Sequence, residues 1–468
     1  MGRSDYDLVI VGCGAAGLSA ALSFATETRA AGQEARIAVL ESAPEAARGG
    51  ATRWTMATFR VGAKDRLDPT WVGKMEEVSK GLTDLDYCKV FEREVPTTIG
   101  VLRDIGVELI ATQPQVALEL TGGTMAPNGG GHAIIEALAA RIASYPGVEI
   151  HYETEAMDLV QAEDGRVCGV RVRGRDGLQR TLNARAVVLA CGGFEGDKAM
   201  LTQYVGPTAC DLKHIAPGIA YNKGAGIRMA MKAGADTAGQ FDMIHAELVD
   251  RRTSRADAVI YAHTYGIVVN GEAQRFYDEG QKTLDASFEL IAYEVWRNQQ
   301  QTAFFIGDQT IRDLPAVMGY FDTDLPPVEA DTIGDLAEQL GLDPDALEAT
   351  VETYNAAVGP GIFDPARYDG KAATGIVPPK SNWAYPLVAP PFFAFPLTAA
   401  ITFTFGGLKT DVDAQVIGTN GHPMPGLYAA GEIVGLFYHD YPSATSVLKA
   451  LTFGRRAGSH AARAGVTG

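Results

Sequence analysis

The N-terminal segment contains the pattern that most constrains the fold of this chain. A short apolar run at 8–11 is followed by GCGAAG at 12–17 and then by helix-forming residues. In such a pattern Gly12 permits a tight turn, Gly14 lets the backbone approach a pyrophosphate, and Gly17 lets helix and strand pack closely. The sequence therefore predicts a strand, a turn and a helix whose N-terminus offers unpaired N–H groups to phosphates.

An acidic residue follows at a spacing that fits ribose recognition. A second strand is predicted at 36–40, and it ends at Glu41. A carboxylate at this place accepts hydrogen bonds from ribose hydroxyls. The glycine pattern alone would be weak evidence. Here it follows a predicted strand and precedes a predicted helix, a second strand and an acidic residue, and this combination predicts a dinucleotide-binding site.

Composition and charge exclude several kinds of partner. The chain has 468 residues, too many for one core, and a formal net charge of −17. This charge argues against nucleic acid and anionic membrane surfaces, which would repel the protein. It allows an anionic small substrate in a locally basic site. No apolar run is long enough to predict a membrane span, and the first strand begins too close to Met1 for a signal peptide.

The five cysteines show no CxxC spacing and are interpreted as reduced packing residues of a cytoplasmic protein. Cys13 and Cys191 lie in glycine turns, where small size is the simplest reason for a cysteine. No metal site is predicted.

The middle of the chain differs in composition from both ends. Before residue 240, helices are predicted within 70–110 and at 133–144, and strands at 148–152, 156–162, 167–173 and 186–190. Beyond it, helices are predicted at 333–339 and 344–358, and a proline-rich return segment at 378–396. A helix at 446–462 closes the chain, with Arg455 and Arg456 expected on its solvated face. A dinucleotide fold that begins at one end and is completed at the other makes the middle an insertion.

Several motifs resemble the flavoprotein subunits of fumarate reductase and succinate dehydrogenase. They are VGCGAAG with Glu41, GGATR at 49–53, ACGGF at 190–194, GIVVNGEAQRFYDEG at 266–280, FGGLKTD at 405–411, LYAAGE at 427–432 and SVLKALTFGRRAG at 446–458. Within that family, the segment at 441–458 is most similar to the tricarballylate dehydrogenase group. The resemblance implies an α/β fold with a Rossmann-like FAD-binding domain, split between 1–240 and 391–468, and an inserted α+β capping domain at 241–390.

The resemblance implies FAD as the cofactor and assigns its contacts. The glycines of the first turn would lie on the pyrophosphate, Glu41 on the adenosine ribose, Gly192 near the adenosine end and Glu432 on the ribityl chain. Backbone N–H groups at 446–447 would face the pyrimidine edge of the flavin, where they stabilise a reduced flavin's negative charge. The expected FAD-binding residues are Gly12, Gly14, Ala15, Ala16, Gly17, Glu41, Ser42, Gly49, Gly50, Ala51, Thr52, Ala156, Ala190, Cys191, Gly192, Gly431, Glu432, Ser446 and Val447.

The mode of FAD attachment follows from one position. Some members of the family attach FAD covalently through a histidine just after the second glycine pair. Ala51 occupies that position here, so non-covalent FAD is expected.

The substrate-binding positions depart from the family pattern. The catalytic arginine expected after the motif at 275–279 falls near Lys282, and the histidine pair expected before FGGL is replaced at 402–403. The arginine expected before the last helix is replaced by Tyr441. Only His245 matches a substrate-binding histidine of the family. These departures argue against fumarate or succinate as the substrate.

Six residues are candidates for substrate chemistry, and each has a structural alternative. They are His245, Lys282, Tyr441, His439, Arg53 and Arg60. The phenol or the amine would carry a proton, unless the tyrosine is packed and the lysine is exposed. The two histidines would contact substrate, unless one lies in the core and the other on the surface. The two arginines would bind an anionic substrate through paired hydrogen bonds.

We therefore expect an FAD-dependent dehydrogenase or reductase that acts on CH–CH bonds of a small carboxylic acid, with a tricarballylate-like polycarboxylate as the nearest fit. One alternative is a ketosteroid or cyclic-ketone desaturase in which Tyr441 moves the proton and phenylalanines at 392–405 line the site. Another is a flavin-carrying protein without substrate chemistry of its own. Electrons would pass to or from a separate carrier, because the sequence has no cysteine cluster for iron–sulfur and no haem motif.

Overall fold

The predicted N-terminal strand lies at the centre of an eight-stranded sheet. In the computed structural model, which describes residues 5–112, 116–120 and 122–466, β1 (Tyr6–Val11) pairs in parallel with β2 (Ile37–Leu40) and β8 (Gln179–Leu189). The apolar run at 8–11 is buried, as expected for a strand covered on both faces. The order along the sheet is β17 (Gln415–Ile417), β18 (Pro423–Ala429), β8, β1, β2 and β5 (Val148–His151).

The longest strand of this sheet, β8, also pairs with the predicted antiparallel hairpin. β6 (Glu155–Gln161) pairs with β7 (Val167–Arg173), which pairs with the first half of β8. The second half of β8 runs parallel to β1 and β18. The expected hairpin and the expected buried parallel strand are thus both confirmed, as parts of one continuous arrangement.

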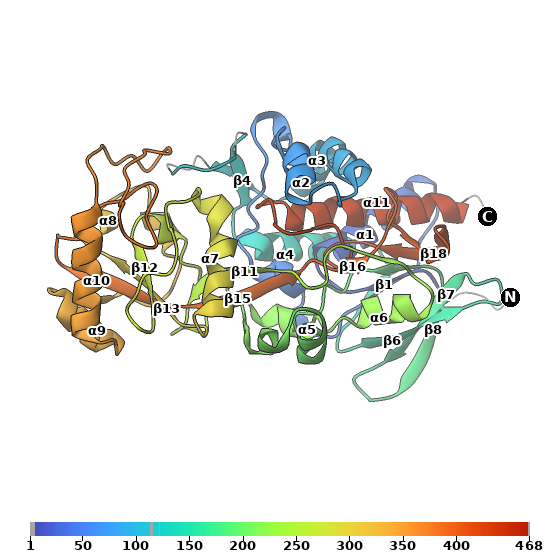
Figure 1. Cartoon of the computed structure of the whole chain (residues 1–468). Helices are drawn as coiled ribbons and strands as arrows, with labels where there is room; N and C mark the ends of the chain where they lie inside the picture. Colours follow the sequence, from blue (N-terminus) through green and yellow to red (C-terminus); the bar gives the residue numbers. More distant parts are fainter. Residues whose placement is uncertain (1–4, 113–115, 121, 467–468) are drawn as a thin grey trace.

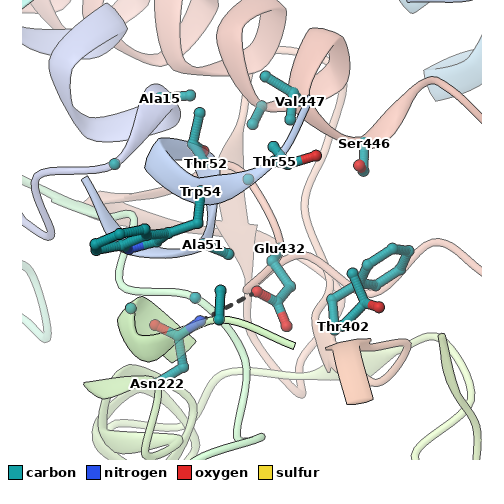
Figure 2. Close-up of a pocket in the computed structure, with 18 of the residues that line it drawn as sticks. Ala15, Ala51, Thr52, Trp54, Thr55, Asn222, Thr402, Glu432, Ser446 and Val447 are labelled. Carbon is teal, nitrogen blue, oxygen red and sulfur yellow. Dashed lines mark hydrogen bonds between the residues drawn. The ribbon is translucent and has the colours of Figure 1, made fainter. Parts of the chain in front are cut away.

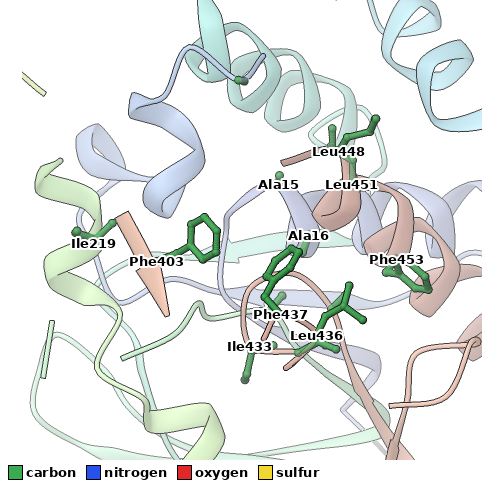
Figure 3. Packing of buried hydrophobic residues seen from close by; sticks show 14 of the residues in the cluster. Ala15, Ala16, Ile219, Phe403, Ile433, Leu436, Phe437, Leu448, Leu451 and Phe453 are labelled. Carbon is green, nitrogen blue, oxygen red and sulfur yellow. The ribbon is translucent and has the colours of Figure 1, made fainter. Parts of the chain in front are cut away.

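Helices from the two ends of the chain pack together beside this sheet. α1 (Ala15–Ala30) lies against α11 (Ser446–Val466), and Figure 3 shows Ala15 and Ala16 near Leu448 and Leu451. α3 (Leu85–Asp104) also contacts α11, and α4 (Gly130–Ile142) contacts α1. Shorter elements of this half are α2 (Trp71–Val78), β3 (Leu109–Thr112), β4 (Thr124–Pro127), α5 (Lys198–Tyr204), α6 (Ala225–Lys232), β10 (Thr237–Ala238) and β16 (Gly407–Leu408).

A second sheet forms the other half of the molecule, at the left of Figure 1. Its order is β11 (Ile244–Asp250), β15 (Phe392–Thr404), β13 (Ala303–Gly307) and β12 (Ile267–Asn270), with β14 (Val328–Ala330) and β9 (Lys213–His214) also pairing with β15. The long β15 therefore pairs with strands from segments up to about 190 positions earlier in the chain. A boundary at residue 391 would place β15 in a different domain from β11, β12, β13 and β14, although not from β9.

The helices of this half include the two predicted from sequence periodicity. α9 (Ile333–Leu340) and α10 (Pro344–Ala357) pack on each other, and their N-caps Thr332 and Asp343 accept hydrogen bonds from the first turns. α7 (Leu284–Asn298) lies against β11 and β15, and α8 (Gln309–Arg312) is a single turn. Among the described residues, no helix is both long and apolar enough to cross a lipid bilayer.

The exposed position expected for two arginines of the last helix is wrong. Arg455 and Arg456 keep only 17% of their side-chain surface exposed, because both pair with Glu94 of α3 and Arg456 also pairs with Asp413. Their acidic partners lie far away in sequence, so the local helical pattern could not reveal them.

Candidate functional site

Two glycines of the turn between β1 and α1, Gly12 and Gly17, could not be replaced by another residue without movement of the backbone. Gly12 has φ +110°, and a Cβ added there would lie 2.3 Å from the carbonyl oxygen of Ala190. A Cβ at Gly17 would lie 2.0 Å from the carbonyl oxygen of Gly12. Gly14 is the N-cap of α1, and no side chain caps that helix. The first-turn N–H groups of α1 are therefore left for another acceptor.

Glu41 is held at the mouth of this turn. Its carboxylate accepts hydrogen bonds from the backbone N–H groups of Cys13 (3.2 Å) and Ala43 (2.8 Å). Burial raises the pKa of Glu41, while these backbone hydrogen bonds act in the opposite direction. The acid predicted from spacing alone is thus fixed beside the glycine turn.

A second glycine turn lies beside the first and lines the same large cavity. Gly49 has φ +108° and starts the short helix η2 (Gly50–Trp54). A Cβ added at Gly50 would meet nothing within 4 Å, so this backbone faces open space. The indole N–H of Trp54 is buried without an acceptor among the described residues. Figure 2 shows Ala51, Thr52 and Trp54 on one side of the cavity, with Glu432 and Thr402 on another.

The C-terminal part of the chain closes the same cavity. Glu432 accepts hydrogen bonds from the backbone N–H (3.0 Å) and hydroxyl (3.3 Å) of Thr404 and from the amide of Asn222 (3.4 Å). That amide also donates to the fully buried Glu195 (3.0 Å). Burial and the charge of Glu432 raise the pKa of Glu195 well above its usual range. Lys449, whose pKa burial lowers to about 8, donates to the carbonyl of Gly431.

These segments enclose one continuous cavity of about 840 Å³, within the range of roughly 300–1,000 Å³ typical of small-molecule sites. Of the expected FAD-binding residues, those that line it are Gly12, Gly14, Ala15, Ala16, Glu41, Ser42, Gly49, Gly50, Ala51, Thr52, Ala156, Ala190, Cys191, Gly192, Gly431, Glu432, Ser446 and Val447. Gly17 lies behind the wall, where it allows close packing. The described residues contain no group of histidine, cysteine and acidic side chains arranged to hold a metal ion.

Two of the six candidates for substrate chemistry line this cavity, namely His245 and Tyr441. The Arg53 guanidinium donates to Glu136 (2.6 Å), and the buried Arg60 pairs with Asp68 (3.4 Å). Arg60 and Lys282 both border a small cavity of about 30 Å³, which shares Tyr441, Asp285 and Ser443 with the large one. His439 has φ +62°, and its backbone N–H donates to Gln240. The structure therefore brings His245 from the middle of the chain and Tyr441 from near its C-terminus into the wall of the large cavity, and places the other four candidates outside that wall.

His245 is fixed between two buried acids. Its Nδ1 lies 2.6 Å from Glu289 and its Nε2 lies 3.1 Å from Glu247. Burial alone would lower the pKa of His245, but hydrogen bonds to the two glutamates and their charges outweigh it and raise the pKa to about 10. The imidazole is therefore a cation whose two nitrogens are both engaged by protein carboxylates.

This arrangement predicts a specific dependence of stability on pH. Because the folded-state pKa of His245 lies above its unfolded value of about 6.5, its stabilising contribution is complete below that value and disappears as pH rises through about 10. Burial raises the pKa of Glu289 to about 7, so its own titration occurs at the lower end of this window. We expect the unfolding free energy to fall by up to a few kcal/mol more between pH 7 and pH 10 in the native protein than in His245→Gln. Urea unfolding at pH 7 and pH 10 measures the unfolding free energy of both proteins. An equal decrease in the native protein and in His245→Gln would contradict the prediction.

Tyr441 lies at the start of α11. Its phenolic oxygen accepts hydrogen bonds from the backbone N–H groups of Thr445 (2.9 Å) and Ser446 (2.8 Å). Its ring contacts those of His245, Phe403 and Phe437 at centroid distances of 4.9, 5.0 and 4.9 Å. No described residue accepts its hydroxyl hydrogen, which leaves that hydrogen for a ligand.

Sequence reasoning missed several residues of the cavity wall. Trp54 directly follows the recognised GGATR turn, so its position was a usable signal. Lys449 lies within the recognised motif at 446–458, so its position was a usable signal too. Asn222 carried no such signal, because it reaches the wall only through the packing of distant segments. Thr402, noted only as a departure from the family pattern, has a buried hydroxyl without a partner among the described residues.

Comparison with known proteins agrees with this geometry. The family model described as "FAD binding domain" matches residues 7–446. The chain is 31% identical to an NADH:acrylate oxidoreductase of Vibrio harveyi, and the match covers 71% of this chain and 32% of that protein. It is 27% identical to a vinyl phenol reductase of Lactiplantibacillus plantarum, and that match covers 98% of this chain and 97% of the reductase. It thus spans about a third of the first relative and nearly all of the second. The open conformation of a flavocytochrome c3 fumarate reductase shares the fold, with a TM-score of 0.79 at 23% identity over 98% of this chain and 78% of that one.

Proposed function

This chain belongs to the FAD binding domain family and is an FAD-dependent oxidoreductase, and we propose that it reduces or desaturates a carbon–carbon bond of a small substrate. The observation that carries the proposal is the single cavity that runs from the uncapped helix of the glycine turn to the second sheet. FAD supplies the hydride chemistry when bound. Residues of the second sheet and of α7 would then bind and orient the substrate.

The residues present fit FAD. The two glycine turns leave room for a dinucleotide, and the indole of Trp54 and the hydroxyl of Thr402 are buried polar groups in need of partners. We propose that the segments 1–240 and 391–468 form a split FAD-binding domain. In this account the insertion at 241–390, completed by β15, forms a cap over the flavin.

We also propose that FAD is held without a covalent bond, since Ala51 offers no nucleophile at the position where some members of the resembled family carry a histidine. Precipitating the yellow protein with trichloroacetic acid is expected to release essentially all the flavin into the supernatant. Absorbance of the supernatant measures this release. A pellet that stays yellow after washing would contradict the proposal.

The lining of the cap end favours a neutral, ring-containing substrate. The arginine and lysine residues of the cavity wall, Arg173, Lys223 and Lys449, all belong to the half that contains the glycine turns. The described cap residues add no arginine or lysine to the wall, but they do add aromatic rings such as Phe288 and Phe403. The full-length relative named as a vinyl phenol reductase supports the same substrate class.

A small carboxylic acid is the second candidate. The relative named as an acrylate oxidoreductase supports it, and the resemblance of the motif at 441–458 to tricarballylate dehydrogenases, noted in the sequence, would fit the same class. Cyclic ketones, including ketosteroids, fit the first candidate with Tyr441 as the proton carrier. A protein that only carries flavin would react with none of these compounds.

A panel of substrates separates these candidates. The oxidised protein would be mixed without oxygen with tricarballylate, 4-ethylphenol and a 3-ketosteroid, and the reduced protein with fumarate, acrylate and 4-vinylphenol. Flavin absorbance near roughly 450 nm reports reduction or reoxidation. We expect the ring compounds to react faster than the acids. Faster reaction of the acids would favour the second candidate, and no reaction would contradict the proposed function.

A further inference from the structure

The polar groups that the cap contributes to the cavity wall include three carboxyls. They come from Glu247 on β11, Asp257 in the loop that follows β11, and Asp285 on α7. Asp285 is already engaged, since it accepts hydrogen bonds from the backbone N–H of Glu119 (3.0 Å) and the hydroxyl of Thr283 (2.8 Å). Glu247 and Asp257 are therefore the pair of interest.

Glu247 has an unused acceptor at the cavity wall. It lies two residues after His245 on β11, so both side chains point to the same face of the sheet. One carboxylate oxygen bonds to His245, while the other, Oε2, is buried and makes no hydrogen bond of ordinary geometry among the described residues. The hydroxyl of Tyr261 is close enough to interact with Glu247, which raises the pKa of that phenol, and it would flank a ligand bound here. The side chain is only 10% exposed. A buried acceptor without a partner is costly, which indicates that a donor from a ligand completes this site.

Asp257 adds a second acceptor in the same region. Its φ of +57° is a conformation that few non-glycine residues adopt, and its Oδ2 accepts a hydrogen bond from the backbone N–H of Met56 (3.1 Å). Burial, followed by the charge of nearby Glu247, raises the pKa of Asp257 to about 7. Near neutral pH a ligand that donates a hydrogen bond would reduce the repulsion between these two groups.

Aromatic rings stand beside these acids. The ring of Phe288 lies edge-on to the rings of His245 and Tyr261, with centroid distances of 5.3 and 5.7 Å. The centroids of the Tyr261 and Tyr320 rings are 6.5 Å apart. All four side chains line the cavity. A planar ring would therefore be surrounded by apolar surface while its polar substituent meets acceptors.

We infer that the cap end of the cavity binds the hydrogen-bond-donating substituent of a ring-containing substrate, a hydroxyl or a protonated amine, at Glu247 and Asp257. This inference rests on the proposed function, because it identifies the substrate class of the same site. It also explains selectivity: a carboxylate at that place would meet two acids and no cation free to pair with it, since both nitrogens of His245 are occupied.

Binding to the oxidised holoenzyme tests the inference without turnover. At pH 8, perturbation of the flavin spectrum would be titrated with 4-ethylphenol, 4-ethylbenzylamine, 4-ethylanisole and 4-ethylbenzoate. We expect the phenol or the amine to bind at least about tenfold more tightly than the ether and the carboxylate, as for a hydrogen bond to a charged acceptor. Which of these two donors binds more tightly identifies the substituent. Equal affinities for donor and ether, or tighter binding of the carboxylate, would overturn the inference.

Variants assign this preference to the two residues. Asp257→Asn and Glu247→Gln should each reduce the preference for the donor several-fold while FAD content stays unchanged. Glu294→Gln is the control, because Glu294 is a cap carboxylate on α7 that lies outside the cavity wall, where it accepts a hydrogen bond from Asn298. A preference that survives in both Asp257→Asn and Glu247→Gln would overturn the assignment.

Different results would contradict the proposed function and this inference. If the donor preference is found but no unsaturated compound reoxidises the reduced flavin, the binding site stands and the oxidoreductase proposal fails. If 4-vinylphenol, its methyl ether and 4-vinylbenzoate reoxidise the flavin at equal rates, the oxidoreductase proposal stands and this inference fails.

Discussion

Replacing Tyr441 with phenylalanine is expected to slow flavin reduction or reoxidation by substrate about 10²- to 10⁴-fold, the usual contribution of a general acid or base. The phenolic oxygen is held by two backbone N–H groups at the start of α11, and no described residue accepts its hydrogen. The ring also lies against His245 at the cavity wall. A proton carrier positioned in this way needs no movement to reach a bound ligand. Anaerobic stopped-flow absorbance measures the rate.

Loss of a buried hydroxyl could also act through stability, so a control is needed. Tyr354→Phe removes a buried cap hydroxyl that donates to the carbonyl of Tyr385 (3.1 Å) and lies outside the cavity wall. We expect this control to keep the native rate, and Tyr441→Phe to keep its FAD content. An unchanged rate in Tyr441→Phe would remove this tyrosine from the mechanism.

The second large effect concerns the first glycine turn. Gly17→Ala should lower the unfolding free energy by about 1–3 kcal/mol or more through overpacking, because the new Cβ would lie 2.0 Å from the carbonyl oxygen of Gly12. Alanine is normally favoured over glycine inside a helix by about 1 kcal/mol. The sign of the effect therefore distinguishes a close contact from ordinary helix propensity. Denaturant unfolding of the apoprotein measures it.

Gly14→Ala is the matched variant, with a different expected result. Its Cβ would lie 3.5 Å from the carbonyl oxygen of Gly49, an ordinary contact, but on the cavity wall. We expect apoprotein stability to change by about 1 kcal/mol or less and FAD affinity to fall at least about tenfold. Stabilisation by Gly17→Ala, or unchanged FAD affinity in Gly14→Ala, would contradict this account of the turn.

The parts of the molecule that could be predicted are those whose signal is local. Strand β1, its turn and α1 follow one another directly, and Glu41 is placed by its distance from that turn. Helices α9 and α10 have apolar residues at helical spacing, and they have capping residues at their starts. Such patterns are sufficient because each of these elements depends on neighbouring residues.

The parts that could not be predicted depend on contacts between distant segments. β15 was expected only as part of a return segment ending at 396, yet it continues to Thr404 and joins the second sheet. The engagement of His245 by Glu289 requires packing of α7 on β11, 44 positions away in sequence. The sequence showed that arginines expected in the family are absent from the substrate site. It could not show that carboxyls and aromatic rings occupy the cap side of the cavity.

The measurement that most directly tests the central claim is a single turnover. The purified protein, with its flavin reduced by dithionite, would be mixed without oxygen with 4-vinylphenol, and the products would be analysed. The account predicts return of the oxidised flavin spectrum with one 4-ethylphenol formed per flavin. A flavin that stays reduced with 4-vinylphenol and with every other unsaturated acid or ketone of the panel would contradict the claim that this cavity performs carbon–carbon oxidoreduction.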